Sequence, residues 1–205
     1  MEEKNIQLLQ SIYKLFMRNG IKSMTMDDIS RGLGMSKKTL YKHFKDKNCL
    51  VAECLENYLH EDEAQMEAIH QSKHNAIDEL FEIIKYNSEK IQAFHPSIHY
   101  DLEKYYPEAW KLFNDYKFNY LASCVEENLK KGIAEGLYRQ NLNTKIIAKM
   151  HIARIDMIFD AEIFPVSEFQ FVDVLMELIR YHIRGIASEK GLNYLSEKFK
   201  NSNIF

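Results

Sequence analysis

The chain has 205 residues, of which 46% are hydrophobic and 28% are charged, with only seven glycines and three prolines. These proportions are typical of a globular protein built from long helices, and they exclude a disordered chain. No apolar run reaches the length of a membrane-spanning helix and the first residues are too polar for a signal peptide, so we expect a cytoplasmic protein. The cysteines Cys49, Cys54 and Cys124 lack CxxC spacing and are expected to be reduced thiols, with a redox sensor as the alternative.

The net charge of −3 is distributed unevenly along the chain. Residues 1–50 hold ten Lys and Arg against five Asp and Glu, so the rest of the chain carries a net charge of −8. Residues 37–47 alone hold five lysines and one aspartate. This asymmetry predicts a basic N-terminal part that meets phosphate groups and an acidic body that is kept away from them.

A first helix is expected from about Lys4 to Met17, because apolar residues recur there at spacings of three and four. Asn19 and Gly20 form its expected end. Its broad apolar face would pack beneath the short helices that follow.

Residues 25–44 contain two short helical patterns separated by a tight turn. Gly34 lies at this turn, where glycine adopts a left-handed conformation at little steric cost. Thr25 and Ser36 are the expected N-caps of the two helices, because their hydroxyl groups can accept from free backbone N–H groups. Asp28 completes the spacing of a capping box with Thr25.

The second of these helices would bury Leu40 and Phe44, which are four residues apart, and leave a basic, polar outer face. Two helices joined by a short glycine turn, the second of them basic outside, are typical of a helix-turn-helix that places a recognition helix in the DNA major groove. A surface helical hairpin with a solvated basic face is the alternative. The residues expected to meet DNA are Ser36, Lys37, Lys38, Thr39, Tyr41, Lys42, His43 and Lys47.

The first fifty residues resemble the DNA-binding domain of the TetR family of bacterial transcriptional regulators. The matching elements are Phe16-x-x-x-Gly20, Thr25-Met26-x-x-Ile29, Gly34-x-Ser36 and Leu40-Tyr41-x-His43-Phe44-x-x-Lys47. The resemblance implies that Thr25 reaches a DNA phosphate, and it adds Met26 to the DNA-binding candidates. It also implies an all-α fold with a three-helix DNA-binding domain over residues 1–48, a connecting helix over about 46–72, and a larger ligand-binding and dimerisation domain over 49–205.

The remaining sequence predicts further helices, several of them interrupted or ended by glycine or proline. They span about Asp46 to His70, Asn75 to Phe94, Ser97 to Tyr105, Glu108 to Glu135, Asn143 to Ile163 and Ser167 to Glu189. The expected breaks are Pro96, Pro107, Gly136, Pro165 and Gly191.

Aromatic residues gather between positions 100 and 120. They are expected either to pack in the core or to form the wall of an apolar pocket whose phenol groups orient a ligand. The resemblance implies the second role, because members of the family hold effectors among these helices. The candidate ligand-binding residues are Tyr100, Tyr105, Trp110, Phe113, Tyr116, Tyr120, His151 and Arg154.

The last two long helices carry apolar residues at a heptad-like spacing, more than one core face needs. The family pattern implies a four-helix dimer interface, and burial within one monomer is the alternative. The candidate interface residues are Ile146, Met150, Met157, Phe169, Val172, Met176, Ile179, Ile183 and Ile186. A two-fold dimer would set two recognition helices about 34–36 Å apart, facing a palindromic operator.

The sequence contains no P-loop, dinucleotide fingerprint, Gly-x-Ser-x-Gly or HExxH motif, so it predicts neither an enzyme nor a cofactor. The pairs His70/His74 and His95/His99 have the spacing of helical metal ligands, but Pro96 splits the second pair and we expect no metal site. We expect a homodimeric repressor that binds double-stranded DNA and is released by a small apolar or aromatic effector. An architectural DNA-binding protein without a ligand, or an activator, is the alternative.

Overall fold

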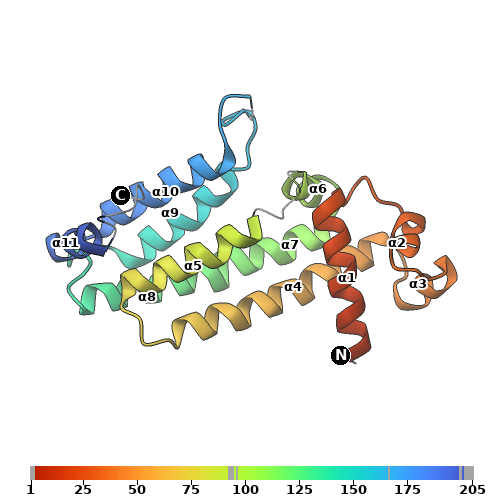
Figure 1. Ribbon diagram of the computed structural model, residues 1–205, viewed down its shortest axis with the longest axis horizontal. Helices are drawn as coiled ribbons and strands as arrows, with labels where there is room; N and C mark the ends of the chain where they lie inside the picture. The colour runs from red at the N-terminus through yellow and green to blue at the C-terminus, as the bar shows by residue number, and fades with distance from the viewer. Residues whose placement is uncertain (1–2, 92–94, 96, 166, 199, 201–205) are drawn as a thin grey trace. The chain divides into compact units, whose positions relative to one another are not determined.

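The computed structural model describes residues 3–91, 95, 97–165, 167–198 and 200 (Figure 1). Phe94 and Pro96, the expected end and break of one helix, lie outside these residues. The part of the chain that is described is helical without a strand, as predicted, and an isolated antiparallel bridge joins Tyr138 and Ala187. No helix in it is long and apolar enough to span a bilayer. The chain divides into two compact units, Met1–Ala68 with Lys85–Tyr116, and Ile69–Ile84 with Lys117–Phe205.

The first unit contains the three N-terminal helices, most of α4 and the elements around α6. The helices are α1 (Glu3–Asn19), α2 (Met26–Gly32), α3 (Lys37–His43), α4 (Lys47–His70), α6 (Ile98–Tyr105) and α7 (Pro107–Asp115), together with the end of α5 (Ala76–Ile91). Helix α1 lies across α4 (Figure 1), and the two meet where the rings of Tyr13 and Tyr58 stack with centroids 4.7 Å apart.

Local signals position α2 and α3 as predicted. Asp28 N–H donates to the Thr25 hydroxyl (3.2 Å) and Thr25 N–H donates to the Asp28 carboxylate (3.0 Å), which completes the capping box. Ser36 caps α3 by accepting from Thr39 N–H at 3.1 Å. Gly34 has φ +65°, the left-handed conformation that the turn requires. The chain therefore turns sharply between two capped helices.

The second unit is built around α8 (Ala122–Ala134), α9 (Thr144–Met157), α10 (Phe171–Ile186) and α11 (Glu189–Lys198), with the beginning of α5. Its core joins residues far apart in the sequence. The Tyr138 hydroxyl donates to Ala76 O at 3.2 Å, and Asn128 donates to the same carbonyl at 2.9 Å. These buried hydrogen bonds fix the beginning of α5 against α8.

The expected helix over 108–135 is observed with an interruption. It comprises α7, a π-helical turn η1 (Tyr116–Leu121) and α8, and Gly136 follows with φ +72°. A π-turn inserts an extra residue into a helix and rotates the face that follows it. Helical periodicity in the sequence does not reveal such a turn.

The two predicted helix boundaries on either side of Pro165 are wrong. Helix α9 ends at Met157 and not near Ile163, and α10 begins at Phe171 after Gln170, so Ser167 is not its cap. The reason is local: the carbonyl of Pro165 accepts from the N–H groups of Glu168 (2.9 Å) and Phe169 (3.0 Å). This turn delays the start of α10.

Gly191 does not end the last long helix as predicted but lies inside α11. A Cβ atom at this position would lie 2.1 Å from the carbonyl oxygen of Leu137, a backbone atom that side-chain rotation cannot move. Glycine is therefore required here for close packing and not for a helix end. Ser188 caps α11 by accepting from Gly191 N–H at 3.1 Å.

Gly191→Ala should destabilise the protein by about 1–3 kcal/mol, because the backbone of Leu137 or α11 must shift to admit the methyl group. The matched control is Gly185→Ala in α10, where nothing lies within 4 Å of the added atom. That change should stabilise the helix by about 0.5–1 kcal/mol. Chemical denaturation of both variants checks the pair, and equal effects would contradict the close packing at Gly191.

Candidate nucleic-acid interface

Helix α3 has one apolar and one basic face. Leu40 and Phe44 are completely or almost completely buried. The opposite face is exposed and carries Lys37, Lys38, Tyr41, Lys42 and His43. Tyr41 is 45% exposed, so its ring and hydroxyl group are accessible from solvent. The arrangement presents a cationic, hydrogen-bonding surface of the kind that enters a DNA groove.

The other DNA-binding candidates near α3 differ in accessibility. Thr25 and Ser36 are exposed, and their hydroxyls serve as helix caps. Thr39 is partly buried and its hydroxyl lies 2.8 Å from that of Ser36. Met26 is only 7% exposed, so its side chain belongs to the core and is not available to DNA.

Lys37 forms an ion pair with Asp27 on α2, with 3.0 Å between Nζ and the carboxylate. This hydrogen bond raises the pKa of Lys37. Both side chains are about half exposed, and ion pairs of this kind contribute little to stability. A phosphate group can therefore replace Asp27 at small cost.

Lys47, at the beginning of α4, donates to the carbonyl of Ile21 at 2.7 Å. Partial burial and the nearby charge of Lys22 lower the pKa of its ammonium group. Lys47 therefore holds α4 to the loop between α1 and α2, a role that its sequence position did not indicate.

A second tie to the same loop was missed by sequence reasoning. Asp101 on α6 is buried, and its carboxylate accepts from the backbone N–H groups of Ile21 (3.1 Å) and Lys22 (2.8 Å). The Lys22 ammonium also lies 3.7 Å from the ring centroid of Tyr105. Because these partners are about 80 residues apart, no local motif reveals the contact. It connects α6 directly to the helix-turn-helix.

Five of the predicted ligand-binding residues lie in the first unit, in three places. The rings of Tyr100 and Tyr105 meet edge to face at 6.2 Å, and those of Trp110 and Phe113 lie 5.7 Å apart. Tyr116 is buried and donates its hydroxyl to Asp62.

The other three predicted ligand-binding residues belong to the second unit. The ring of His151 lies 4.0 Å from that of His182, and burial lowers their pKa values to about 4 and about 3, so both are neutral at pH 7. Arg154 lies 5.7 Å from the Tyr181 ring. Tyr120 on η1 is partly buried.

The predicted interface residues divide by exposure. Ile146, Met150, Phe169 and Val172 are 42–55% exposed. Met157 and Met176 are partly buried. Ile179, Ile183 and Ile186 are at most 7% exposed and pack inside the second unit itself. Among these predicted residues, the exposed ones therefore lie on α9, at Phe169 and at the beginning of α10.

Comparison with known proteins supports this interpretation. Residues 8–54 match the model of the bacterial regulatory proteins of the tetR family. The chain is 26% identical over 148 residues to the HTH-type transcriptional repressor KstR2 of Mycobacterium tuberculosis (strain ATCC 25618 / H37Rv). This alignment covers 69% of this chain and 72% of the repressor.

Two solved structures have the same fold. A transcriptional regulator from Saccharomonospora viridis in complex with choline has a TM-score of 0.74 at 16% identity, covering 92% of this chain and all of that one. The regulator FadR from Bacillus subtilis in complex with stearoyl-CoA has a TM-score of 0.67 at 17% identity, covering 89% of this chain and 99% of that one.

Proposed function

We propose that this chain is a repressor of the TetR family of bacterial regulatory proteins, that it binds a palindromic operator as a homodimer, and that it is released by a small apolar or aromatic effector. The observation that carries the proposal is the exposed lysine-rich face of α3, held outward by a capped helix-turn-helix. A DNA target places the protein in the cytoplasm. Residues 1–48 would form the DNA-binding domain and residues 49–205 the domain for ligand and dimer.

The roles on α3 follow from chemistry. Lys38, Thr39 and His43 can reach base edges, since lysine donates to guanine and the threonine methyl group meets thymine. Lys37, Tyr41 and Lys42 can bind phosphates, which gives a salt-dependent and sequence-independent part of the affinity. The Lys47 ammonium group donates to a carbonyl of the loop before α2. Its positive charge lies near the start of α4, and both this charge and the helix N-terminus favour binding of a phosphate.

The exposed apolar residues of α9 and α10 support a two-fold dimer. Ile146 and Met150 are one helical turn apart on α9, and each is more than half exposed. A surface of this kind is costly in water unless a partner covers it. An isologous interface repeats the same patch on both subunits and presents two copies of α3 to two half-sites.

Effector release requires a ligand that binds the DNA-free state more tightly than the DNA-bound state. The structural neighbours crystallised with choline and with stearoyl-CoA support a ligand-binding role for this fold. The hydrogen bonds from Ile21 and Lys22 to Asp101 would couple a movement of α6 to the DNA-binding part, because they join α6 to the loop before α2.

Selection of bound DNA from a random pool tests this function. The expected result is an enriched inverted repeat whose half-sites are centred about one helical turn apart. Retention of DNA without any enriched sequence would support an architectural protein and contradict the repressor. An enriched but asymmetric site would contradict the two-fold dimer.

A further inference from the structure

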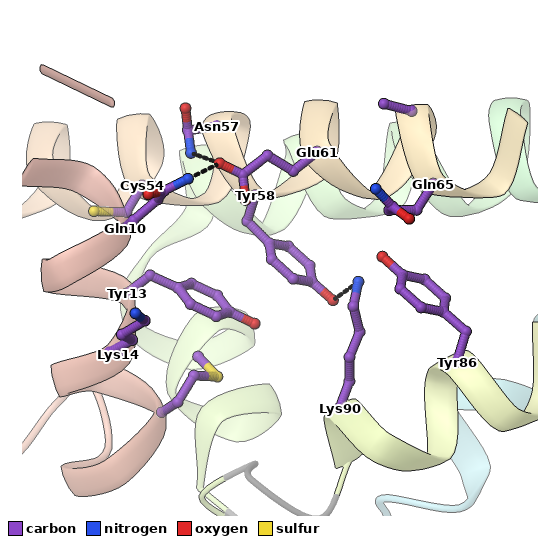
Figure 2. Close-up of a pocket in the computed structure, with 12 residues that line it drawn as sticks. Gln10, Tyr13, Lys14, Cys54, Asn57, Tyr58, Glu61, Gln65, Tyr86 and Lys90 are labelled. Atoms are coloured by element: carbon purple, nitrogen blue, oxygen red, sulfur yellow. Dashed lines mark hydrogen bonds between the residues drawn. The ribbon is translucent and has the colours of Figure 1, made fainter. Parts of the chain in front are cut away.

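A groove in the first unit is lined by residues at helical spacing from α1, α4 and α5, and has a volume of about 650 Å³ (Figure 2). This volume is within the range of small-molecule sites. None of the lining residues belongs to the ligand-binding set expected from the sequence. The lining residues are Gln10, Tyr13, Lys14, Met17, Cys54, Asn57, Tyr58, Glu61, Ala64, Gln65, Tyr86 and Lys90.

Aromatic rings form one wall of the groove. Tyr13 and Tyr58 stack almost in parallel, with 11° between their planes. Tyr86 lies across from them on α5 (Figure 2). Burial raises the pKa of all three phenols, so they remain neutral at pH 7. Flat neutral rings of this kind favour contact with another ring.

The ammonium group of Lys90 points into the space between Tyr58 and Tyr86 (Figure 2). It donates to the Tyr58 hydroxyl at 3.3 Å, lies 4.0 Å from the Tyr86 ring centroid and pairs with Asp62. The Asp62 carboxylate also accepts from the hydroxyls of Tyr86 and Tyr116. Asp62 therefore divides its charge among three donors, and part of the field of the Lys90 ammonium remains for a ligand in the groove.

The rim of the groove adds another cation. Lys14 is exposed on α1 and lines the groove. The acid in the lining, Glu61, already accepts from the side-chain amides of Gln10 (2.7 Å) and Asn57 (2.9 Å). The lining therefore has two cationic groups, Lys14 and Lys90, beside two carboxylates that already accept from other side chains: Glu61 in the lining and Asp62 next to Lys90.

We propose that this groove binds an aromatic monocarboxylate, with the ring against Tyr13 and Tyr58 and the carboxylate on Lys90. The regulatory meaning rests on the proposed function: α1 supplies part of the lining, so an occupied groove acts directly on the DNA-binding helices. Binding itself does not depend on DNA.

The test measures binding of 2-naphthoate to the full-length chain by calorimetry without DNA, beside the neutral 2-naphthamide and the cationic 2-naphthylmethylammonium. Only the carboxylate is expected to bind measurably. Lys90→Met should weaken it by about tenfold to a hundredfold, the effect of losing a charged hydrogen bond. Asp62→Asn should strengthen it several-fold, because Lys90 is then released from its internal partner.

Controls separate binding from folding. The double variant Asp62→Asn/Lys90→Met removes both members of this ion pair together, leaves neither of them unpaired, and should fold yet lose naphthoate. Lys85→Met removes an exposed lysine from the same helix outside the groove and should bind as the parent does.

Equal binding of the amide and the carboxylate would overturn the proposal, as would unchanged naphthoate affinity in the folded double variant. Tighter binding of the ammonium probe to Asp62→Asn would also overturn it. A chain that selects an operator but binds no naphthoate refutes the groove alone. A chain that shows the expected variant pattern but selects no operator refutes only the proposed function.

Discussion

Replacing Lys38 and Lys42 together by alanine should weaken operator binding by about tenfold to a hundredfold and make its salt dependence shallower. Both lysines are exposed on the basic face of α3, one helical turn apart. In a dimer, loss of the Lys42 phosphate contact from both subunits should lower the slope of log K against log salt concentration by about 2. Loss of Lys38 should reduce the ratio of specific to non-specific affinity. Fluorescence anisotropy over a salt series measures both quantities.

The matched control is Lys145→Ala with Lys149→Ala, two exposed lysines at the same spacing on α9. It removes the same charge from the second unit and should leave the slope unchanged. Equal slopes in all three proteins would mean that α3 does not meet the phosphates.

Met150→Glu combined with Val172→Glu should convert the proposed dimer into a monomer. These side chains are 52% and 53% exposed on α9 and α10, and an interface there would bury the introduced carboxylates without a partner. A monomer binds one half-site at a time and loses the effective concentration that links the two. Operator affinity should therefore fall by about 10²–10⁴-fold. Sedimentation velocity and operator titration on the same samples check both effects.

Leu192→Glu is the control for this variant, since Leu192 is 44% exposed on α11, outside the proposed interface. It should remain a dimer with full affinity. A double variant that still sediments as a dimer would remove α9 and α10 from the interface.

The helix-turn-helix could be predicted almost residue by residue because its determinants are local. Thr25 and Ser36 cap helices through hydrogen bonds to residues three positions away, and Gly34 adopts the conformation that its turn requires. Leu40 and Phe44 face inward because they share one side of α3. Each of these signals lies within one or two helical turns of sequence.

Contacts between distant segments could not be predicted in this way. Asp101 holds a loop about 80 residues away, and Gly191 is required by the carbonyl of Leu137. The pairing of Lys90 with Asp62 likewise depends on how α5 lies beside α4. Spacing along one helix does not specify which side chain of another helix will face it.

Periodicity also does not distinguish burial within the monomer from burial against a partner. Val172, Ile179 and Ile183 continue one apolar pattern, yet Val172 is 53% exposed while Ile183 is completely buried. The difference arises because the second half of α10 packs in the core of the second unit. Only the three-dimensional packing distinguishes the exposed part of this apolar pattern from the buried part.

If α3 reads the DNA sequence, replacing Lys38 by alanine must change the base preference of the protein. Selection from a random pool, carried out in parallel on the parent and this variant, compares the two preferences position by position. Lys38→Ala is expected to lose base preference at one symmetric position in each half-site and to keep it elsewhere. An identical preference at every position in both proteins would contradict sequence reading by α3.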